Sequence, residues 1–271
     1  MTRFVANARM YSVAPEAEAA WRALLLHIAE DAGEALEYMS YPAPQPLEVL
    51  WARDDLGAVQ MCGYPIARRL ADVIPLAAPI PLAEWAGGRP LYRSDLIVRV
   101  DSPYRSLADT FGGRLGWTVE HSHSGFNALR HHLLQYRSAV RPVLYREVIG
   151  PLITAGRVLD SVRKGAIDVG PLDAYWHALI EKYRPELTAD IRVLESTELA
   201  PIPAFVSART MPCDVARRLR DALSHAATRD WFPRLGAALL IQGFAPVEIE
   251  DFAAMLAWDA DANAAGYPVP A

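Results

Sequence analysis

The chain has 271 residues, of which 52% are hydrophobic and 22% are charged, and its formal net charge is -5. This composition predicts a globular protein with a substantial core, organised as one large domain or two lobes. The net negative charge and the lack of any run of Lys or Arg argue against a nucleic-acid partner or an anionic membrane surface. Any anion that this protein binds must therefore be held by local groups.

The N-terminal sequence MTRFVANARMYS has no continuous apolar segment after its first basic residue, so it is not expected to be a secretory signal. Nowhere do about 18 uninterrupted apolar residues occur, so we expect no membrane insertion. Cys62 and Cys213 have neither metal-ligand spacing nor the pattern of a disulfide framework. A single bridge between them stays open at this point.

Strand and helix patterns alternate in the first part of the chain. Residues 3–11 predict a strand, and Pro15 opens a helix with apolar residues at helical spacing. Residues 36–41 and 56–63 predict further strands, with a short helix at 46–54 between them. This strand, helix, strand order indicates a parallel sheet with helices on its faces.

The second part of the chain repeats this order. Strands are predicted at 94–100, 114–119 and 191–197, and the segment at 201–209 looks extended. After it, three segments have a helical pattern with few strand signals: 212–227, 230–241 and 246–258. We expect these last helices to return and cover the first lobe.

The expected architecture is therefore α/β with two lobes, each a sheet with flanking helices. Lobe 1 would comprise residues 1–93 and 208–271, and lobe 2 residues 94–207. Two crossover strands, at 94–100 and 201–207, would join them. Small ligands of such folds bind at the carboxyl ends of the strands, so we expect a cleft between the lobes to hold the ligand.

The stretch EHSHSGFNALRHH, residues 120–132, lies between a predicted strand and a predicted helix. Ser122 or Ser124 then falls near the helix N-terminus, where unpaired N–H groups and the helix dipole favour an anion. Hydroxyls beside such N–H groups can form an oxyanion pocket without a lysine, and Gly125 would let the backbone approach the anion closely. The simpler interpretation is that a serine only caps the helix.

The segment SDLIVRVDSPYRSLADTFGGRLGW leads to a loop reading TVEHSHSGFNAL. The order of these motifs resembles that of the phosphonate-binding proteins of ABC importers, in which a similar segment forms the strand after the crossover. In the family this loop is of the type Asn-Asp-Pro-x-Ser-x-Ser-Gly-Tyr. The segments GAIDVGPLDAYWHAL and PIPAFVSAR continue the resemblance, which runs from about Arg9 to Phe244.

The resemblance implies a type II periplasmic-binding fold that closes around a ligand, and it implies roles for particular residues. Ser122, Ser124 and the main chain at Gly125 and Phe126 match the anion-binding loop, and Asp173 matches an acidic residue that faces the ligand. Aromatic contacts would come from three tyrosines, of which the last is the weakest match: Tyr92, Tyr64 and Tyr11. From its position alone, Asp173 has the alternative role of complementing a helix N-terminus.

Several positions depart from the family pattern. Val119 and Glu120 replace the Asp-Pro of the loop, and His121 and His123 stand where small or polar residues are usual. Either histidine could line the pocket and donate to an anion. Arg157 lies near the position of a family histidine. The resemblance therefore transfers the logic of an anion pocket more safely than the identity of the ligand.

No metal, cofactor or catalytic residue is predicted. His121 and His123 form an HxH pair, and His131 and His132 are adjacent, but no Cys, Asp or Glu motif completes a ligand set. The sequence also has no GxSxG elbow, Walker loop or GxGxxG loop.

The primary hypothesis is a binding protein for phosphonate, phosphate or a related small oxyanion, the substrate-binding component of an ABC importer with a permease as partner. The alternatives are an enzyme on the same scaffold, similar to menaquinone-biosynthesis enzymes, or a ligand-sensing domain. In the enzyme, Asp173 or Glu120 would transfer a proton. The resemblance implies a periplasmic location, whereas the lack of a signal implies the cytoplasm if Met1 is the native start.

Overall fold

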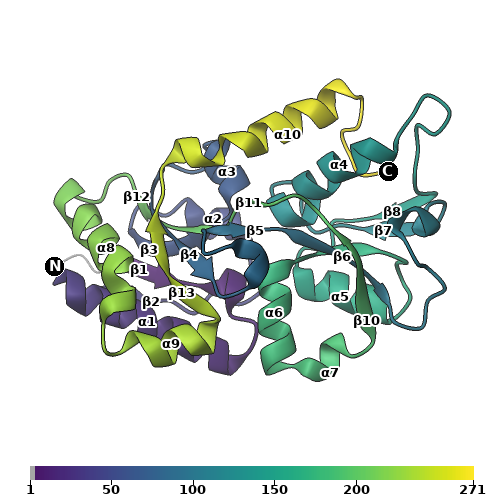
Figure 1. Cartoon of the computed structure of the whole chain (residues 1–271). Coiled ribbons are helices and arrows are strands. Elements are labelled where there is room, and N and C mark those ends of the chain that lie inside the picture. Colours follow the sequence, from purple (N-terminus) through teal and green to yellow (C-terminus); the bar gives the residue numbers. More distant parts are fainter. Residues whose placement is uncertain (1–3) are drawn as a thin grey trace. The chain divides into compact units, whose positions relative to one another are not determined.

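A computed structural model describes residues 4–271, which form an α/β protein with two compact units (Figure 1). Unit 1 comprises Met1–Tyr92 and Pro201–Ala253, and unit 2 comprises Arg93–Ala200 and Ala254–Ala271. The expected α/β class, with sheets flanked by helices, is confirmed. The first residue of the strand predicted at 3–11 lies outside the described residues.

The C-terminal residues do not follow the predicted division. We expected residues 208–271 to belong entirely to the first lobe, but residues 254–271 belong to unit 2. The reason is a set of side-chain contacts with the segment 123–131, described below, that a helical pattern alone does not reveal.

Unit 1 is built on a six-stranded sheet with the order β13-β4-β12-β3-β1-β2. Its strands are β1 (Phe4–Asn7), β2 (Leu36–Tyr38), β3 (Leu56–Met61), β4 (Val73–Pro81), β12 (Ala204–Ala208) and β13 (Ile241–Pro246). β1 pairs in parallel with β2 and β3, as the sequence predicts. β12 runs antiparallel to β3 and β4, and β13 antiparallel to β4, so the sheet is mixed.

The helices of unit 1 are α1 (Pro15–Ala32), α2 (Leu47–Trp51), α3 (Gly63–Ala67), α8 (Cys213–His225) and α9 (Phe232–Leu239). Its short 3-10 segments are η1 (Arg9–Tyr11), η2 (Glu84–Ala86), η6 (Ala226–Thr228) and η7 (Ile249–Phe252). α1 buries Trp21, Leu24 and Ile28 and packs against α8 and α9, at the left of Figure 1. Cys62 is buried and Cys213 exposed, and both are free thiols.

Two strands of this sheet were missed from the sequence. β4 contains Pro75, Pro79 and Pro81, and β13 contains Gly243 and ends at Pro246. Proline lacks an N–H for the ladder, so such segments are normally excluded from strands. Here the pairing shifts register next to these residues, between Phe205 and Val206 and again in β13. The expectation of few strand signals after 212 was wrong for β13.

Unit 2 has a three-stranded antiparallel sheet with the order β10-β6-β9, formed by β6 (Ser94–Arg99), β9 (Gly170–Asp173) and β10 (Ile191–Ser196). A parallel pair joins β7 (Arg114–Gly116) to β8 (Glu147–Ile149). β5 (Leu91–Tyr92), which belongs to unit 1, and β11 (Ala200–Pro201) form a separate two-stranded sheet.

The helices of unit 2 follow these strands. They are η3 (Leu107–Thr110), the π turn η4 (His123–Asn127), α4 (Ala128–Leu133), η5 (Leu134–Tyr136), α5 (Ala155–Arg163), α6 (Ala174–Tyr183) and α7 (Pro185–Thr188), with α10 (Ala253–Ala264) at the C-terminus. The core of unit 2 includes Leu96, Leu115, Trp117 and Phe126. Among the described residues, no helix is long and apolar enough to cross a membrane.

Candidate functional site

The loop between β7 and α4 folds as the π turn η4, with Ser122 as its N-cap. The Ser122 hydroxyl accepts a hydrogen bond from the Gly125 amide at 3.0 Å, and the Asn127 amide donates to the Ser122 carbonyl, also at 3.0 Å. The capping role predicted for a serine here therefore belongs to Ser122. Single π turns are rare and occur frequently at functional sites.

Ser124 is the second residue of the π turn, and its hydrogen bonds differ from those of Ser122. It is half-exposed, and its hydroxyl makes no hydrogen bond with any residue that the structure describes. Its carbonyl accepts a hydrogen bond from the Ser94 hydroxyl at 2.8 Å, which fixes the backbone of Ser124 to the start of β6. The Ser124 backbone is therefore fixed within the π turn, while its hydroxyl makes no bond with the described residues.

Gly125 is required by close packing rather than by an unusual backbone conformation. A Cβ atom at this position would lie 1.9 Å from the Thr118 Oγ1, and its φ is not in the left-handed region. Thr118 is 6% exposed, and its Oγ1 has no hydrogen-bond partner within residues 4–271. A buried hydroxyl without a partner is unusual, so Thr118 joins the candidate site. Thr118 was not predicted from the sequence, in which its position just before the loop is the only indication of a role in the site.

The N-terminus of α5 is bonded to the same residue. The Ile153 amide donates to the Thr118 carbonyl at 3.1 Å, and Thr154 caps the helix by accepting from the Arg157 amide at 3.2 Å. Ile153 has a φ of 72°, a strained conformation for a β-branched residue, and such strain concentrates at functional sites. The N-termini of η4 and α5 are therefore tied together through Thr118.

Arg157 occupies the first turn of α5. Its side chain is exposed, and its guanidinium forms no hydrogen bond or ion pair with the described part of the chain. A cation near a helix N-terminus is opposed by the helix dipole, so an anion beside it would relieve an unfavourable interaction.

Asp173 caps α6. Its Oδ1 accepts hydrogen bonds from the Tyr175 amide at 2.9 Å and the Trp176 amide at 3.0 Å, and the residue is 8% exposed. The role at a helix N-terminus that its position predicts is therefore present. Asp173 also pairs with Ser94 in the β6–β9 ladder, and Ser94 bonds to Ser124, so Asp173 and Ser124 are close to the same residue. Contact between Asp173 and a ligand stays a prediction.

The two histidines of the loop have different environments. His123 is 1% exposed and stacks on Trp258 with 5.1 Å between ring centroids, whereas His121 is half-exposed. Burial, with a smaller effect of His131, lowers the pKa of His123 to about 3, so its imidazole is neutral at physiological pH. Contact between His123 and a ligand would require the ring to leave this packing. Its predicted ligand role remains untested.

The other histidine pair has protein partners. His131 stacks on Trp258 at 4.7 Å, and His132 Nε2 lies 2.9 Å from Glu195. Within the described residues, no group of three or more His, Cys, Asp or Glu side chains is arranged to hold a metal ion.

The three candidate tyrosines belong to unit 1. Tyr11 lies in η1 rather than at the end of the first strand, Tyr64 in α3, and Tyr92 in β5. All three are at most 2% exposed, and the Arg68 guanidinium lies over the Tyr64 ring at 5.4 Å from its centroid. The candidate residues of unit 2 are Ser122, Ser124, Gly125, Phe126, His121, His123, Asp173 and Arg157. Phe126 contributes its backbone, because its ring packs on Trp117.

The two α/β units, each with its own sheet and flanking helices, have the fold class of the two-lobed periplasmic substrate-binding proteins. The model of one family, described as the periplasmic phosphonate substrate-binding protein of an ABC transporter, matches residues 12–252. The chain therefore belongs to this family of phosphonate-binding transport components. The resemblance and the expected function as the substrate-binding component of an ABC transporter are confirmed, and the enzyme alternative is not favoured.

Solved structures share this fold at low sequence identity. A binding protein of an ABC phosphonate transporter from Pseudomonas aeruginosa is 16% identical with a TM-score of 0.79, covering 97% of this chain and 88% of that chain. PhnD1 from Prochlorococcus marinus, in complex with methylphosphonate, is 13% identical with a TM-score of 0.79, covering 97% and 98%. The alkanesulfonate-binding protein from Xanthomonas axonopodis pv. citri, bound to MOPS, is 15% identical with a TM-score of 0.65, covering 100% and 96%.

These identities are low, so the structural likeness shows the fold alone. No curated protein matches this sequence.

Proposed function

We propose that unit 2 binds a small phosphonate, or a related oxyanion such as phosphate, at the N-terminus of the π turn. The half-exposed Ser124 hydroxyl carries the proposal, because it is fixed at a helix N-terminus and makes no bond with the described residues. Backbone N–H groups and the local dipole favour negative charge at such a position. Thr118, beneath Gly125, is the second candidate hydroxyl.

Arg157 distinguishes this site from one made of amides and hydroxyls alone. Its exposed guanidinium lies on the helix whose N-terminus is bonded to Thr118, and it has no anionic partner in the described chain. A guanidinium can pair with a phosphonate through two parallel hydrogen bonds. In this role Arg157 takes the place of the family histidine and adds a full positive charge to the site.

Asp173 supports discrimination among anions. A carboxylate can accept a hydrogen bond from a protonated phosphonate or phosphate, and Asp173 pairs in the ladder with Ser94, whose hydroxyl bonds to Ser124. A fully ionised sulfonate has no such proton, so the carboxylate would repel it. The proposed order of affinity is therefore phosphonate and phosphate above sulfonate.

We extend to this chain the partner and the compartment that the family implies, a permease of an ABC importer and the periplasm. Fractionation of cells that express the native gene tests the location. Recovery of the protein only in the cytoplasm would contradict it.

The test of ligand class is a thermal-shift and calorimetric panel of methylphosphonate, phosphate, an alkanesulfonate and a carboxylate. A ligand at 100 times its Kd stabilises the folded form by about 2.7 kcal/mol through mass action. Ser124→Ala should weaken phosphonate binding roughly tenfold to hundredfold, since a hydrogen bond to a charged group is worth about 1.5–3 kcal/mol.

Ser161→Ala is the matched control. Ser161 is a half-exposed serine on α5 whose hydroxyl forms no hydrogen bond in the described structure. Equal affinities of the two variants for methylphosphonate would reject Ser124 as a ligand contact.

A further inference from the structure

The C-terminal segment, residues 254–271, packs against side chains of the π turn. The Asn127 side-chain amide donates to the Met255 carbonyl at 2.8 Å, and its nitrogen lies 3.3 Å from His123 Nδ1. Because an amide nitrogen only donates, this contact is a hydrogen bond in the tautomer whose Nδ1 carries no proton. Asn127 is completely buried, so one C-terminal carbonyl and one turn histidine satisfy its donors.

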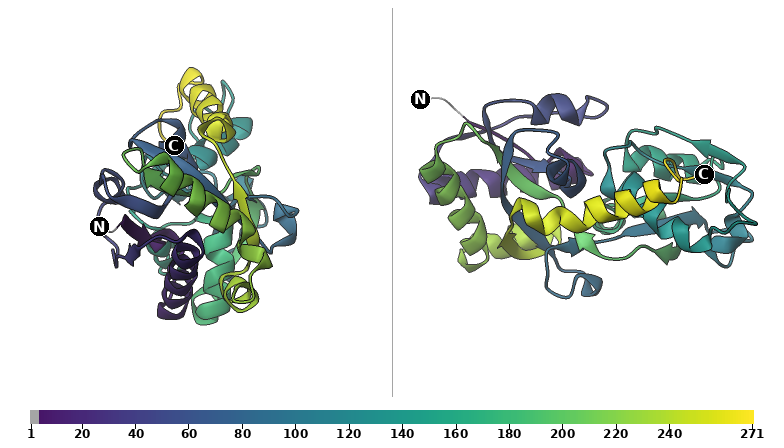
Figure 2. Two further views of the ribbon diagram at one scale, coloured as in Figure 1. Left: turned by 90° about the vertical axis from the view of Figure 1, so that its left-hand side faces the viewer. Right: turned by 90° about the horizontal axis from the view of Figure 1, so that it is seen from above.

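Trp258 of α10 packs between two residues of the segment 123–131. Its ring stacks on His131 at 4.7 Å with an interplanar angle of 4°, and on His123 at 5.1 Å with an angle of 28°. One tryptophan thus holds the first residue of the π turn and a residue of the following helix, α4. Figure 2 shows the yellow C-terminal helix beside the teal elements of this unit.

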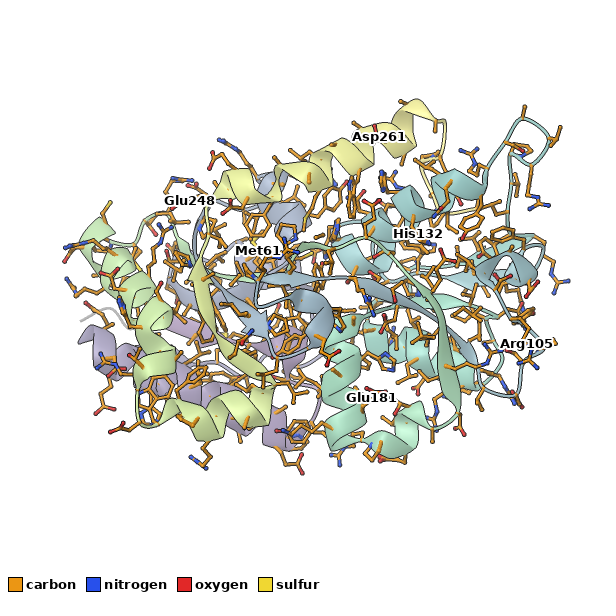
Figure 3. All side chains as sticks on the ribbon, viewed as in Figure 1. Met61, Arg105, His132, Glu181, Glu248 and Asp261 are labelled. Carbon is orange, nitrogen blue, oxygen red and sulfur yellow. The ribbon has the colours of Figure 1, made fainter. Side chains whose placement is uncertain are left out.

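Arg130 links the same two segments through hydrogen bonds. It is 2% exposed and donates to Asn127 Oδ1 at 3.3 Å. Its further hydrogen-bond acceptors among the described residues lie in the C-terminal segment: Asn263 Oδ1 at 3.1 Å, the Pro268 carbonyl at 3.0 Å, the Tyr267 carbonyl at 3.5 Å and the Asp259 carboxylate. Figure 3 marks α4 by His132 and α10 by Asp261. A buried guanidinium needs such partners, so this network fixes α4 to the C-terminal residues.

These contacts act on a turn that needs outside support. A π turn is a rare conformation with poorer intrinsic stability than an α turn, and it persists where its surroundings determine it. Without the C-terminal segment, the buried amide of Asn127 would lose the Met255 carbonyl, and the ring of His123 would lose its stacking on Trp258. The family model match ends at residue 252, immediately before this segment.

We propose that residues 254–271 position the oxyanion-binding turn, with Trp258 and the Met255 carbonyl holding residues 123–127 in the π conformation. These are positioning residues, because they contact the His123 and Asn127 side chains of the turn rather than the ligand. The inference rests on the proposed function for its ligand, but the positioning of the turn is measurable without any ligand.

The test compares Trp258→Ala with Leu256→Ala. Leu256 lies on the same helix and is 40% exposed, so its truncation removes apolar volume without touching the turn. The measurements are amide hydrogen exchange over residues 122–127 and the Kd for methylphosphonate. Trp258→Ala should speed exchange in the turn and raise the Kd about tenfold, because it removes two stacked pairs. Exchange in β6 and β9 should stay unchanged, and Leu256→Ala should alter neither quantity.

Conservative substitution provides a second readout. Trp258→Phe keeps a stacking ring and should recover most of the protection of the turn. If Trp258→Ala does not fold, Asn263→Ala removes one exposed acceptor of Arg130 and should still speed exchange at 123–127.

Unchanged exchange in a folded Trp258→Ala protein, or in Asn263→Ala if the first variant is unfolded, overturns the proposal. Failure of the wild-type protein to bind methylphosphonate instead contradicts the proposed ligand. In that case the exchange data alone decide whether the segment positions the turn.

Discussion

Substitution of Gly125 by alanine tests the packing on which the candidate site depends. The added Cβ would lie 1.9 Å from Thr118 Oγ1 and 2.8 Å from both the Cβ and Cγ2 of Thr118. Rotation of the threonine side chain cannot remove the contact with its Cβ. The backbone of the turn or of Thr118 must therefore move.

The expected cost follows from the depth of this overlap. Overpacking a well-packed interior typically costs about 1–3 kcal/mol, and a contact below 2 Å belongs at the upper end of that range. We therefore expect Gly125→Ala to lower the free energy of unfolding by about 3 kcal/mol. Because the turn moves, methylphosphonate binding should weaken as well.

Chemical denaturation measures the stability and calorimetry the affinity. The double variant Thr118→Ala/Gly125→Ala lacks the hydroxyl and the methyl group of Thr118. Only the 2.8 Å contact between the new Cβ and the Cβ of residue 118 remains. The two substitutions should therefore compensate each other by about 1 kcal/mol or more, as residues in contact commonly do.

Gly156→Ala is the control for the effect of alanine itself. Gly156 lies in α5, and the nearest atoms to its added Cβ are 3.9 Å away. This substitution should stabilise the protein by about 0.5–1 kcal/mol, the difference in helix propensity. If Gly125→Ala were as stable as the wild-type protein, the close packing between Thr118 and the turn would be refuted.

Three further predictions concern capping, charge and pH. Ser122→Ala should lower stability by about 1 kcal/mol through loss of the cap, while Ser124→Ala should stay within about 0.5 kcal/mol of the wild type in denaturation. Arg157→Ala should weaken methylphosphonate binding and reduce the salt dependence of that binding. Arg105 is an exposed arginine of the same unit, and Arg105→Ala should change neither quantity. If binding to Arg157→Ala kept the salt dependence of the wild type, the guanidinium would be excluded from the site. The pKa of His123 in the folded protein, about 3, lies below its ordinary value of 6.5. The contribution of His123 to stability is therefore complete above pH 6.5, and it is lost at about 1.4 kcal/mol per pH unit as the pH falls toward 3. An NMR titration that showed this ring protonated at pH 5 would contradict its burial.

The sequence predicted the location of the loop but not its bonding. The pattern of small polar residues before an amphipathic helix correctly indicated a capped N-terminus at Ser122. The structure gives a reason for Gly125 that the sequence did not indicate, while the expected close approach to an anion stays a prediction. Close approach of Thr118, a residue that precedes it by seven positions, requires a glycine, and no local pattern reports such a contact.

Long-range packing explains the larger differences. Prolines concealed β4, because the shifts in register that accommodate them depend on the neighbouring strand β12. The assignment of 254–271 to the first lobe failed for a similar reason. Hydrogen bonds from Asn127 and Arg130 to residues more than 120 positions away determine where that segment packs.

The central claim is that the π turn of unit 2 holds an oxyanion with its hydroxyls and N-terminal amides. A titration with methylphosphonate, followed by the backbone amide resonances of the whole chain, tests it most directly. The account predicts saturable shifts that are largest at Ser124, Gly125 and Phe126, with Thr118 following them. Saturable binding that leaves these four amides unmoved would contradict it.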